Sequence, residues 1–272
     1  MQQLFSSNFS GKDENPMIQL FKNEWRKVRF PVLTLMLALS IIMCVLSCAV
    51  YRNYTLHYEL EAWEVATPVF NLLFPLVVTL PLCWNLYYER KNNFLLYVRP
   101  RVRPGKYLAA KWLVQAGCAF LLLFIPYVLA AVFSLYVKEP IDPIRYQGFD
   151  SPYEHVFLQM FTEKPMIYAL LLSLQKGLIG VLVMTFGFVL ALYVNNIFLV
   201  LTGPFIYTEL ENFILSILGV PEYRLVVSFE PTAVASNSYS PVSVVFGPAL
   251  LLLVCGVIWF YYAKIRKCTV VR

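Results

Sequence analysis

The sequence predicts an all-α polytopic membrane protein, with six transmembrane helices preceded by an amphipathic interfacial helix. Of its 272 residues, 59% are hydrophobic and only 14% are charged, and the mean hydropathy is +0.64. Soluble proteins carry about 25% charged residues. The apolar residues gather in six long runs, and the basic residues gather in the segments between alternate runs. These observations together indicate a chain that crosses a membrane several times.

Each apolar run is close to the roughly 20 residues that a helix needs to cross about 30 Å of hydrocarbon. The six predicted spans are Pro31–Tyr51, Ala66–Tyr88, Trp112–Val137, Met166–Val194, Ile197–Leu218 and Val242–Tyr262. The first run is too long for the core of a cleaved signal peptide, and a polar and amphipathic region precedes it. We therefore expect residues 31–272 to form one six-span domain.

Residues 1–30 are expected to form a cytoplasmic tail followed by an amphipathic helix that begins near Pro16. Phe21 and Trp25 belong to an apolar stripe at helical spacing, and Arg26 and Arg29 lie on the other side. Such a helix suits the interface of the lipid bilayer, with its tryptophan at the level of the headgroups. The alternative is a simple basic flank to the first span, which would need no apolar stripe.

The distribution of lysine and arginine predicts the orientation. With both termini in the cytoplasm, the inner segments carry sixteen of these residues and the outer segments carry five, as the positive-inside rule requires. The outer segments are then residues 52–65, 138–165 and 219–241. Of the two longer ones, residues 219–241 form the less polar, which is a candidate to dip back into the membrane, where non-helical backbone must be covered by protein.

One lysine and two glutamates fall inside the predicted spans. Lys176 lies near the middle of the fourth span, where an unpaired charge is costly, by about 2.5–3.5 kcal/mol. Glu209 and Glu211 lie in the fifth span, and the turn between these spans is short. The two helices are therefore expected to be antiparallel neighbours, with Lys176 paired to Glu209 or Glu211. Such a pair would either fix the helix register or lie on a path for substrate or protons.

The sequence offers no catalytic or metal site. Its two histidines, His57 and His155, are far apart, the six cysteines lack the spacing of metal ligands, and no hydrolase, metalloprotease or nucleotide-binding motif is present. The net charge of +6 comes from basic residues beside apolar spans, which indicates topology rather than nucleic-acid binding. We expect no enzyme activity and no cofactor bound by this chain.

The predicted loop of residues 89–111 is strongly basic, yet it contains the apolar run Phe94–Val98. A loop that only connects two spans needs no apolar run. Apolar side chains ringed by Arg and Lys suit a helix that docks into a groove on a partner protein. The alternative is that these side chains lie on the membrane interface.

This order of parts resembles the type-2 ABC exporter permeases, in which the ATPase is often a separate subunit. In that family an acidic residue ends the second span, and a Leu-Leu pair, a proline and a lysine follow before the third span. The matching residues here are Glu89, Leu95-Leu96, Pro100 and Lys106 or Lys111. Asn92-Asn93 departs from the Gly-Thr that is frequent in the family.

The resemblance implies a permease that works with two ABC ATPase subunits and with a second permease, identical or related, in a bacterial cytoplasmic membrane. ATP and Mg would bind to the partner ATPase. A short coupling helix from Glu89 to Val98 would dock on that ATPase, through the set Glu89, Arg90, Phe94, Leu95, Leu96, Tyr97 and Arg99. The cargo would be amphipathic (a peptide, an antibiotic or a lipid-like molecule) and would move by alternating access.

Two other functions stay open from the sequence. The chain could be an ion-coupled secondary transporter that uses Lys176 with Glu209 or Glu211, because intramembrane charges mark ion pathways. No inverted repeat relates its two halves, however, as many such transporters have. It could also be a structural subunit of a larger membrane assembly that shares this topology without transporting anything.

Overall fold

The computed structural model describes residues 16–54, 56, 58–94, 104–140, 157–233 and 240–265, and within these ranges it contains helices and no strand. Six of the helices are long and apolar enough to cross a membrane, which confirms the predicted fold class. These helices are α1 (Pro16–Ala49), α3 (Pro68–Lys91), α5 (Pro104–Val132), α7 (Pro165–Tyr193), α8 (Ile197–Ile217) and α10 (Pro241–Phe260). Each contains most of one predicted span.

The third of these helices begins earlier than the sequence predicted. It starts at Pro104 rather than at Trp112, because proline is well suited to the first helical turn and the lysines that follow it are compatible with helix. The second ends at Lys91. Residues 89–91 and 104–111 are therefore helical, and the loop predicted at residues 89–111 is shorter at both ends.

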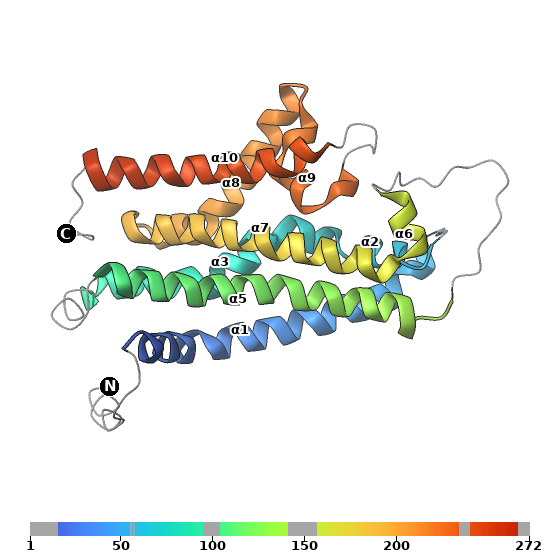
Figure 1. The fold of residues 1–272 in the computed structure, drawn as a ribbon, viewed down its shortest axis with the longest axis horizontal. Coiled ribbons are helices and arrows are strands. Elements are labelled where there is room, and N and C mark those ends of the chain that lie inside the picture. The colour runs from blue at the N-terminus through green and yellow to red at the C-terminus, as the bar shows by residue number, and fades with distance from the viewer. Residues whose placement is uncertain are drawn as a thin grey trace.

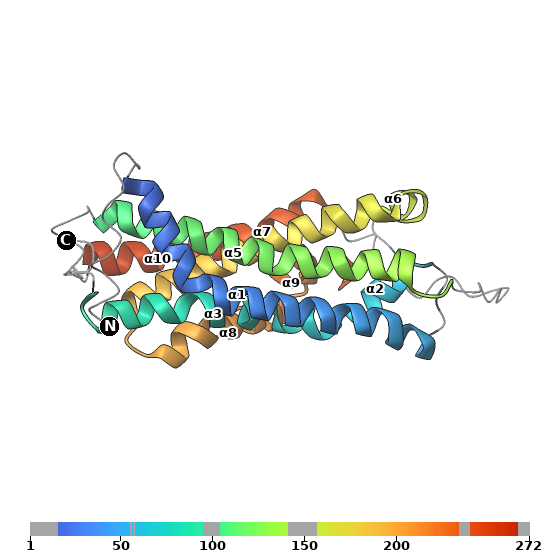
Figure 2. The same ribbon diagram turned by 90° about the horizontal axis from the view of Figure 1, so that it is seen from below.

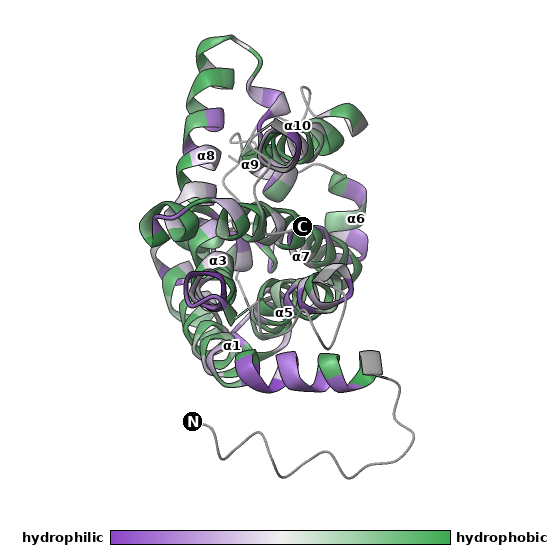
Figure 3. Ribbon diagram, turned by 90° about the vertical axis from the view of Figure 1, so that its left-hand side faces the viewer, coloured by the Kyte–Doolittle hydropathy of each residue, from purple (hydrophilic) through white to green (hydrophobic). Residues whose placement is uncertain are grey.

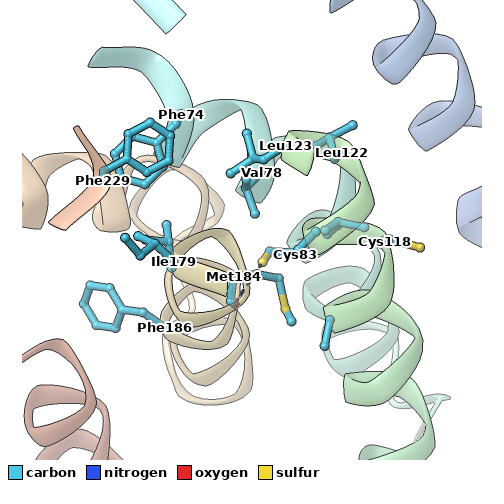
Figure 4. Close-up of a cluster of buried hydrophobic side chains, with 14 of the residues drawn as sticks. Phe74, Val78, Cys83, Cys118, Leu122, Leu123, Ile179, Met184, Phe186 and Phe229 are labelled. Carbon is cyan, nitrogen blue, oxygen red and sulfur yellow. Dashed lines mark hydrogen bonds between the residues drawn. The ribbon is translucent and has the colours of Figure 1, made fainter. Parts of the chain in front are cut away.

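Helix α7 occupies the centre of the bundle (Figures 1 and 2). It packs against α3, α5, α8 and α10, whereas α1 packs on the far side of α5. In its most apolar stretch 72% of α7 is buried inside the protein, compared with 22–28% for α1, α8 and α10. The buried side chains of α3, α5 and α7 form the main core (Figure 4). A charged side chain on α7 therefore has to find its partner inside the protein.

Small residues let neighbouring helices approach α7 closely. A Cβ atom at Gly180 would lie 2.6 Å from a methyl carbon of Leu123 on α5, and one at Gly187 would lie 2.8 Å from the sulfur of Cys83 on α3. Membrane helices associate through such close packing, because lipid offers no hydrophobic driving force between them. These glycines therefore help to set α7 between α3 and α5.

The first part of α1 lies across one end of the bundle (Figure 3). Pro31 lies within α1, and its missing N–H and its ring account for a bend between this part and the span. Val28 is buried, whereas Trp25, Arg26 and Arg29 are exposed. Phe21 is half-buried, and the position of this part in the membrane interface stays a prediction.

Short helices cover the opposite end of the bundle (Figure 1). They are α2 (Glu61–Ala66), the π-helical turn η2 (Phe133–Val137) that ends the third span, and α6 (Leu158–Glu163). The ring of Phe161 on α6 lies edge-on to Tyr58 and to Tyr168 of α7, with centroids 5.7 and 5.2 Å apart. Aromatic contacts thus hold this end together.

The chain between α8 and α10 turns back into the bundle. Helix α8 contains Pro204 and leans away from its neighbours in its later part (Figures 1 and 3). The returning chain forms η3 (Pro221–Tyr223), α9 (Leu225–Phe229) and η4 (Pro231–Ala233). Leu225 and Phe229 are fully buried, and the ring of Phe229 stacks on Phe74 of α3 at 3.9 Å (Figure 4). Most of the residues from Leu225 to Glu230 are therefore buried within the bundle, and the predicted dip into the membrane stays a prediction.

Gly247 on α10 sets how closely α9 packs on that helix. A Cβ atom there would lie 2.7 Å from the Cα of Leu225 and 2.8 Å from its nitrogen, and backbone atoms cannot rotate away. We expect Gly247→Ala to lower the free energy of unfolding by about 1–3 kcal/mol, the usual cost of overpacking, as measured by thermal unfolding in detergent. In Gly256→Ala, on the same helix, the added Cβ meets nothing within 4 Å. Equal effects of the two substitutions would contradict the packing of α9 on α10.

Candidate functional sites

Five side chains from three helices form an ion cluster at the end of the bundle that the interfacial part of α1 crosses. Lys111 of α5 binds Glu24 of α1 at 3.0 Å and Glu89 of α3 at 2.6 Å. Lys27 binds the same two carboxylates, at 2.5 and 2.9 Å. The hydroxyl of Tyr107 donates to both of them, at 3.1 and 2.9 Å. We call this set the basic-end ion cluster.

Helix geometry places these side chains together. Glu24 and Lys27 are three residues apart, and Tyr107 and Lys111 are four apart, so each pair shares one face of its helix. Lys111 is 1% exposed and Glu24 is 3% exposed. Two carboxylates face two ammonium groups, so the cluster is balanced in charge. It ties the interfacial part of α1 to the last turn of α3 and the beginning of α5, the two helix ends that residues 92–103 connect.

The residues predicted to couple to an ATPase are placed in different surroundings. Glu89 lies in the last turn of α3 and is bound within the basic-end ion cluster, so the expectation of a separate helix that begins at Glu89 is wrong. Arg90 donates to the carbonyl of Val194 and, at 3.2 Å, to the side chain of Asn195. Phe94 is half-buried beneath the ammonium of Lys27, 5.3 Å from the ring centroid.

The remaining members of the predicted coupling set, Leu95, Leu96, Tyr97 and Arg99, lie outside the described residues. Their docking role stays a prediction. The sequence left two candidates for the lysine before the third span. Lys111 is the one that binds Glu89, whereas Lys106 is exposed.

The second site surrounds Lys176. The carboxylate that pairs with this lysine is not one of the two that the sequence predicted. The ammonium binds the carboxylate of Glu230, which follows α9, and not Glu209 or Glu211. Lys176 is fully buried. Asn71 of α3 donates to the same carboxylate oxygen at 2.7 Å and accepts from Lys176 at 3.3 Å and from the hydroxyl of Tyr127. We call these four side chains the Lys176 cluster.

The course of α8 explains why the predicted pair is wrong. Helices α7 and α8 are neighbours, as expected from the short turn between them, but α8 leans away after its Gly203-Pro204 step. Glu211 instead accepts from the backbone N–H of Leu225, at 3.2 Å to each oxygen, and so caps the start of α9. Glu209 is half-exposed, and within the described part of the chain it has no hydrogen bond or ion pair.

Three aromatic rings surround the ammonium of Lys176. The nitrogen lies 4.4 Å from the ring centroid of Tyr127, 5.0 Å from that of Phe229 and 5.3 Å from that of Trp63. A cation attracted by ring faces in a desolvated site gains about 2 kcal/mol. The lysine therefore sits in an aromatic cage with a carboxylate on one side.

Sequence reasoning missed several of the residues that complete these two sites. Glu24 is the one acid within the interfacial stripe, and Glu230 is the acid that follows the apolar run Leu225–Phe229, which was expected to enter the membrane. An isolated carboxylate in an apolar setting needs a partner. That signal was available for both, but Lys111 is distant in the chain from Glu24, and Lys176 is distant from Glu230.

The described residues include no group of three or more His, Cys, Asp or Glu side chains that could hold a metal ion. The geometry instead joins helices through buried ion pairs. Comparison of the chain with protein-family models, with curated proteins and with solved structures gave no match.

Proposed function

We propose that this chain is the permease subunit of an ATP-driven ABC exporter, which moves an amphipathic molecule across the membrane by alternating access. ATP would be hydrolysed on a separate ATPase subunit, present in two copies. The proposal rests on the six-span architecture, on the resemblance of residues 89–111 to the coupling loop of type-2 exporters, and on one feature of the structure, the basic-end ion cluster.

The basic-end ion cluster carries the proposal because of what it connects. A force applied to residues 92–103 reaches the ends of α3 and α5 directly. Through Glu24 and Lys27 it also reaches the interfacial part of α1. Buried and multiply bonded ion pairs are rigid when all their members are satisfied. Three helix ends would therefore move as one unit when a partner pushes the loop.

The other half of the proposal is a second permease copy beside α8. This helix exposes Ile206, Leu210, Phe213 and Ile217. Glu209 lies on the same helix, half-exposed and without a partner within the described residues. A carboxyl group that faces lipid in the middle of a membrane is costly, so burial against a second subunit would be favourable.

Leu95→Asp tests the coupling role. If Leu95 docks in a groove on an ATPase, a charge there removes an apolar anchor, and truncation of such anchors commonly costs 2 kcal/mol or more, roughly a 30-fold loss of affinity. We expect an ATPase that copurifies with the tagged wild-type chain to be lost from Leu95→Asp, as measured by mass spectrometry of gently extracted membranes.

The matched control for this experiment is Val102→Asp, which adds the same charge to the same loop outside the Leu-Leu pair. Membrane insertion of both variants is checked by protease accessibility. A Leu95→Asp chain that retains the ATPase would count against the docking role. Absence of any ATPase from the wild-type preparation would count against the ABC proposal itself.

Ion-coupled transport remains the second candidate, favoured by the ion pair of the fully buried Lys176 with Glu230 among the long helices. Its predicted residues change, because Glu230 replaces Glu209 and Glu211 as the partner of the lysine. The two mechanisms differ in their energy source. Transport into vesicles that persists without ATP and stops with a protonophore would favour ion coupling.

A further inference from the structure

The contacts of the Lys176 cluster divide into a fixed part and a part on a short segment. Lys176, Asn71 and Tyr127 belong to three long helices, α7, α3 and α5. Glu230 and Phe229 belong to the short segment of α9 and η4. Displacement of this one segment would remove the carboxylate and one wall of the aromatic cage together. The fixed part would keep its place in the bundle.

The fixed part is a set of donors arranged around a carboxylate. Lys176 and the amide of Asn71 both donate to one oxygen of Glu230, and Thr232 donates to the other at 2.9 Å. The hydroxyl of Tyr127 holds Asn71 through the amide oxygen, which turns the amide nitrogen toward the carboxylate. Charge-assisted hydrogen bonds of this kind are the strong ones in recognition of carboxylate and phosphate groups.

Burial of these charged groups costs free energy of folding, which a purely structural role does not require. Lys176 is fully buried, and the side chain of Glu230 is 12% exposed. Replacement of a buried ion pair by well-packed apolar residues is often neutral or stabilising, by about 1–4 kcal/mol. Phe74 and Phe229 already hold α9 against α3 by stacking (Figure 4). A charged pair is therefore not needed to fix the segment.

The surroundings favour an anion that carries an apolar group. Lys176 lies about 16 Å along α7 from its first residue, Pro165, as 1.5 Å per residue gives. That depth is out of reach for a hydrated ion unless protein lines the way. The rings of Trp63 and Tyr127 flank the ammonium, and they would contact the part of a ligand next to its charged group.

We infer that Lys176, Asn71 and Tyr127 form a binding site for the carboxylate or phosphate group of an amphipathic cargo, and that Glu230 occupies this site in the resting protein. The inference rests on the proposed export function and narrows its substrate class to anionic amphiphiles. Movement of α9 withdraws Glu230 and Phe229, and the anionic group of the cargo takes the place of the glutamate carboxylate.

Glu230→Gln tests the site in the purified chain without an ATPase. The probe is dodecyl phosphate, with dodecyltrimethylammonium as the cationic counterpart and inorganic phosphate as the headgroup alone. Binding is measured from the ligand-induced rise in the thermal unfolding midpoint, which depends on ligand concentration over Kd. We expect Glu230→Gln to bind dodecyl phosphate at least about tenfold more tightly than wild type, because the competing carboxylate is gone.

Two further variants make the test specific. The tighter binding should disappear in Glu230→Gln with Lys176→Met, which removes the charged donor. Glu222→Gln makes the same chemical change on η3, away from the cluster, and should bind as wild type does. Equal binding of the cationic probe by Glu230→Gln would overturn the inference. Binding of inorganic phosphate equal to that of dodecyl phosphate would show a headgroup site with no place for an amphiphile, and would also overturn it.

Glu230→Gln removes the carboxylate that is ion-paired with Lys176, and the variant can therefore fold poorly. If it folds poorly, its yield should rise when dodecyl phosphate is present during extraction and should not rise with the cationic probe. No rescue by the anion would overturn the inference. Either failure leaves the export function untouched, because copurification of an ATPase tests that function independently.

Discussion

Lys176→Met is expected to lower the free energy of unfolding by about 3–5 kcal/mol, the cost of leaving one member of a buried ion pair without its partner. The carboxylate of Glu230 would keep only neutral donors, Asn71 and Thr232. A loss of this size is a large share of the stability of most proteins. The protein is heated in detergent to a series of temperatures, and size-exclusion chromatography then measures the fraction that stays monodisperse.

Removal of the second charge should reverse much of this loss. In Lys176→Met with Glu230→Leu both members of the ion pair are removed, so the double variant should be more stable than Lys176→Met alone. Lys164→Met is the matched control, because Lys164 is exposed at the start of the same helix. A Lys176→Met protein as stable as Lys164→Met would contradict the pairing with Glu230.

Lys111→Met is the second substitution with a large expected effect. It removes the ammonium that binds both Glu24, which is buried, and Glu89, which is partly buried, so the two carboxylates would share only Lys27. We expect a loss of about 3 kcal/mol, at the lower end for a broken buried pair because one counter-ion remains. Thermal unfolding in detergent measures it.

Lys106 lies in the same helix as Lys111, but its side chain is exposed whereas that of Lys111 is buried. Lys106 is exposed and has no ion pair within the described residues, so Lys106→Met should change stability by less than about 0.5 kcal/mol. Lys111→Met with Glu24→Gln restores the balance of charge and should recover part of the loss. Equal effects of the two lysine substitutions would show that the basic-end ion cluster is not formed.

Sequence patterns predict the spans well because they depend on local composition. A run of about 20 apolar residues crosses the membrane as a helix, whatever its neighbours are, since every backbone polar group must be satisfied within the segment. The boundaries depend on more than composition. Lys106 and Lys111 were assigned to a loop because they are charged, but Lys111 is buried at a helix contact.

The partner of Lys176 shows where prediction from sequence stops. The short turn at Asn195-Asn196 correctly predicts that α7 and α8 are neighbours, but it does not say how far they run together. Pro204 makes a bend possible without giving its direction. The bend leaves Glu209 on an open face and turns Glu211 toward α9. The returning segment then brings Glu230 to the lysine from a distant part of the chain.

The sequence by itself therefore determines that this protein is an all-α polytopic membrane protein, where its six spans lie, and that Lys176 needs a buried partner. These properties follow from the free energy of placing apolar and charged groups in hydrocarbon, which each segment carries alone. Only the tertiary structure decides which carboxylate meets which lysine. That choice depends on helix bends and on the packing of α9 between distant helices, and both are set by the whole bundle at once.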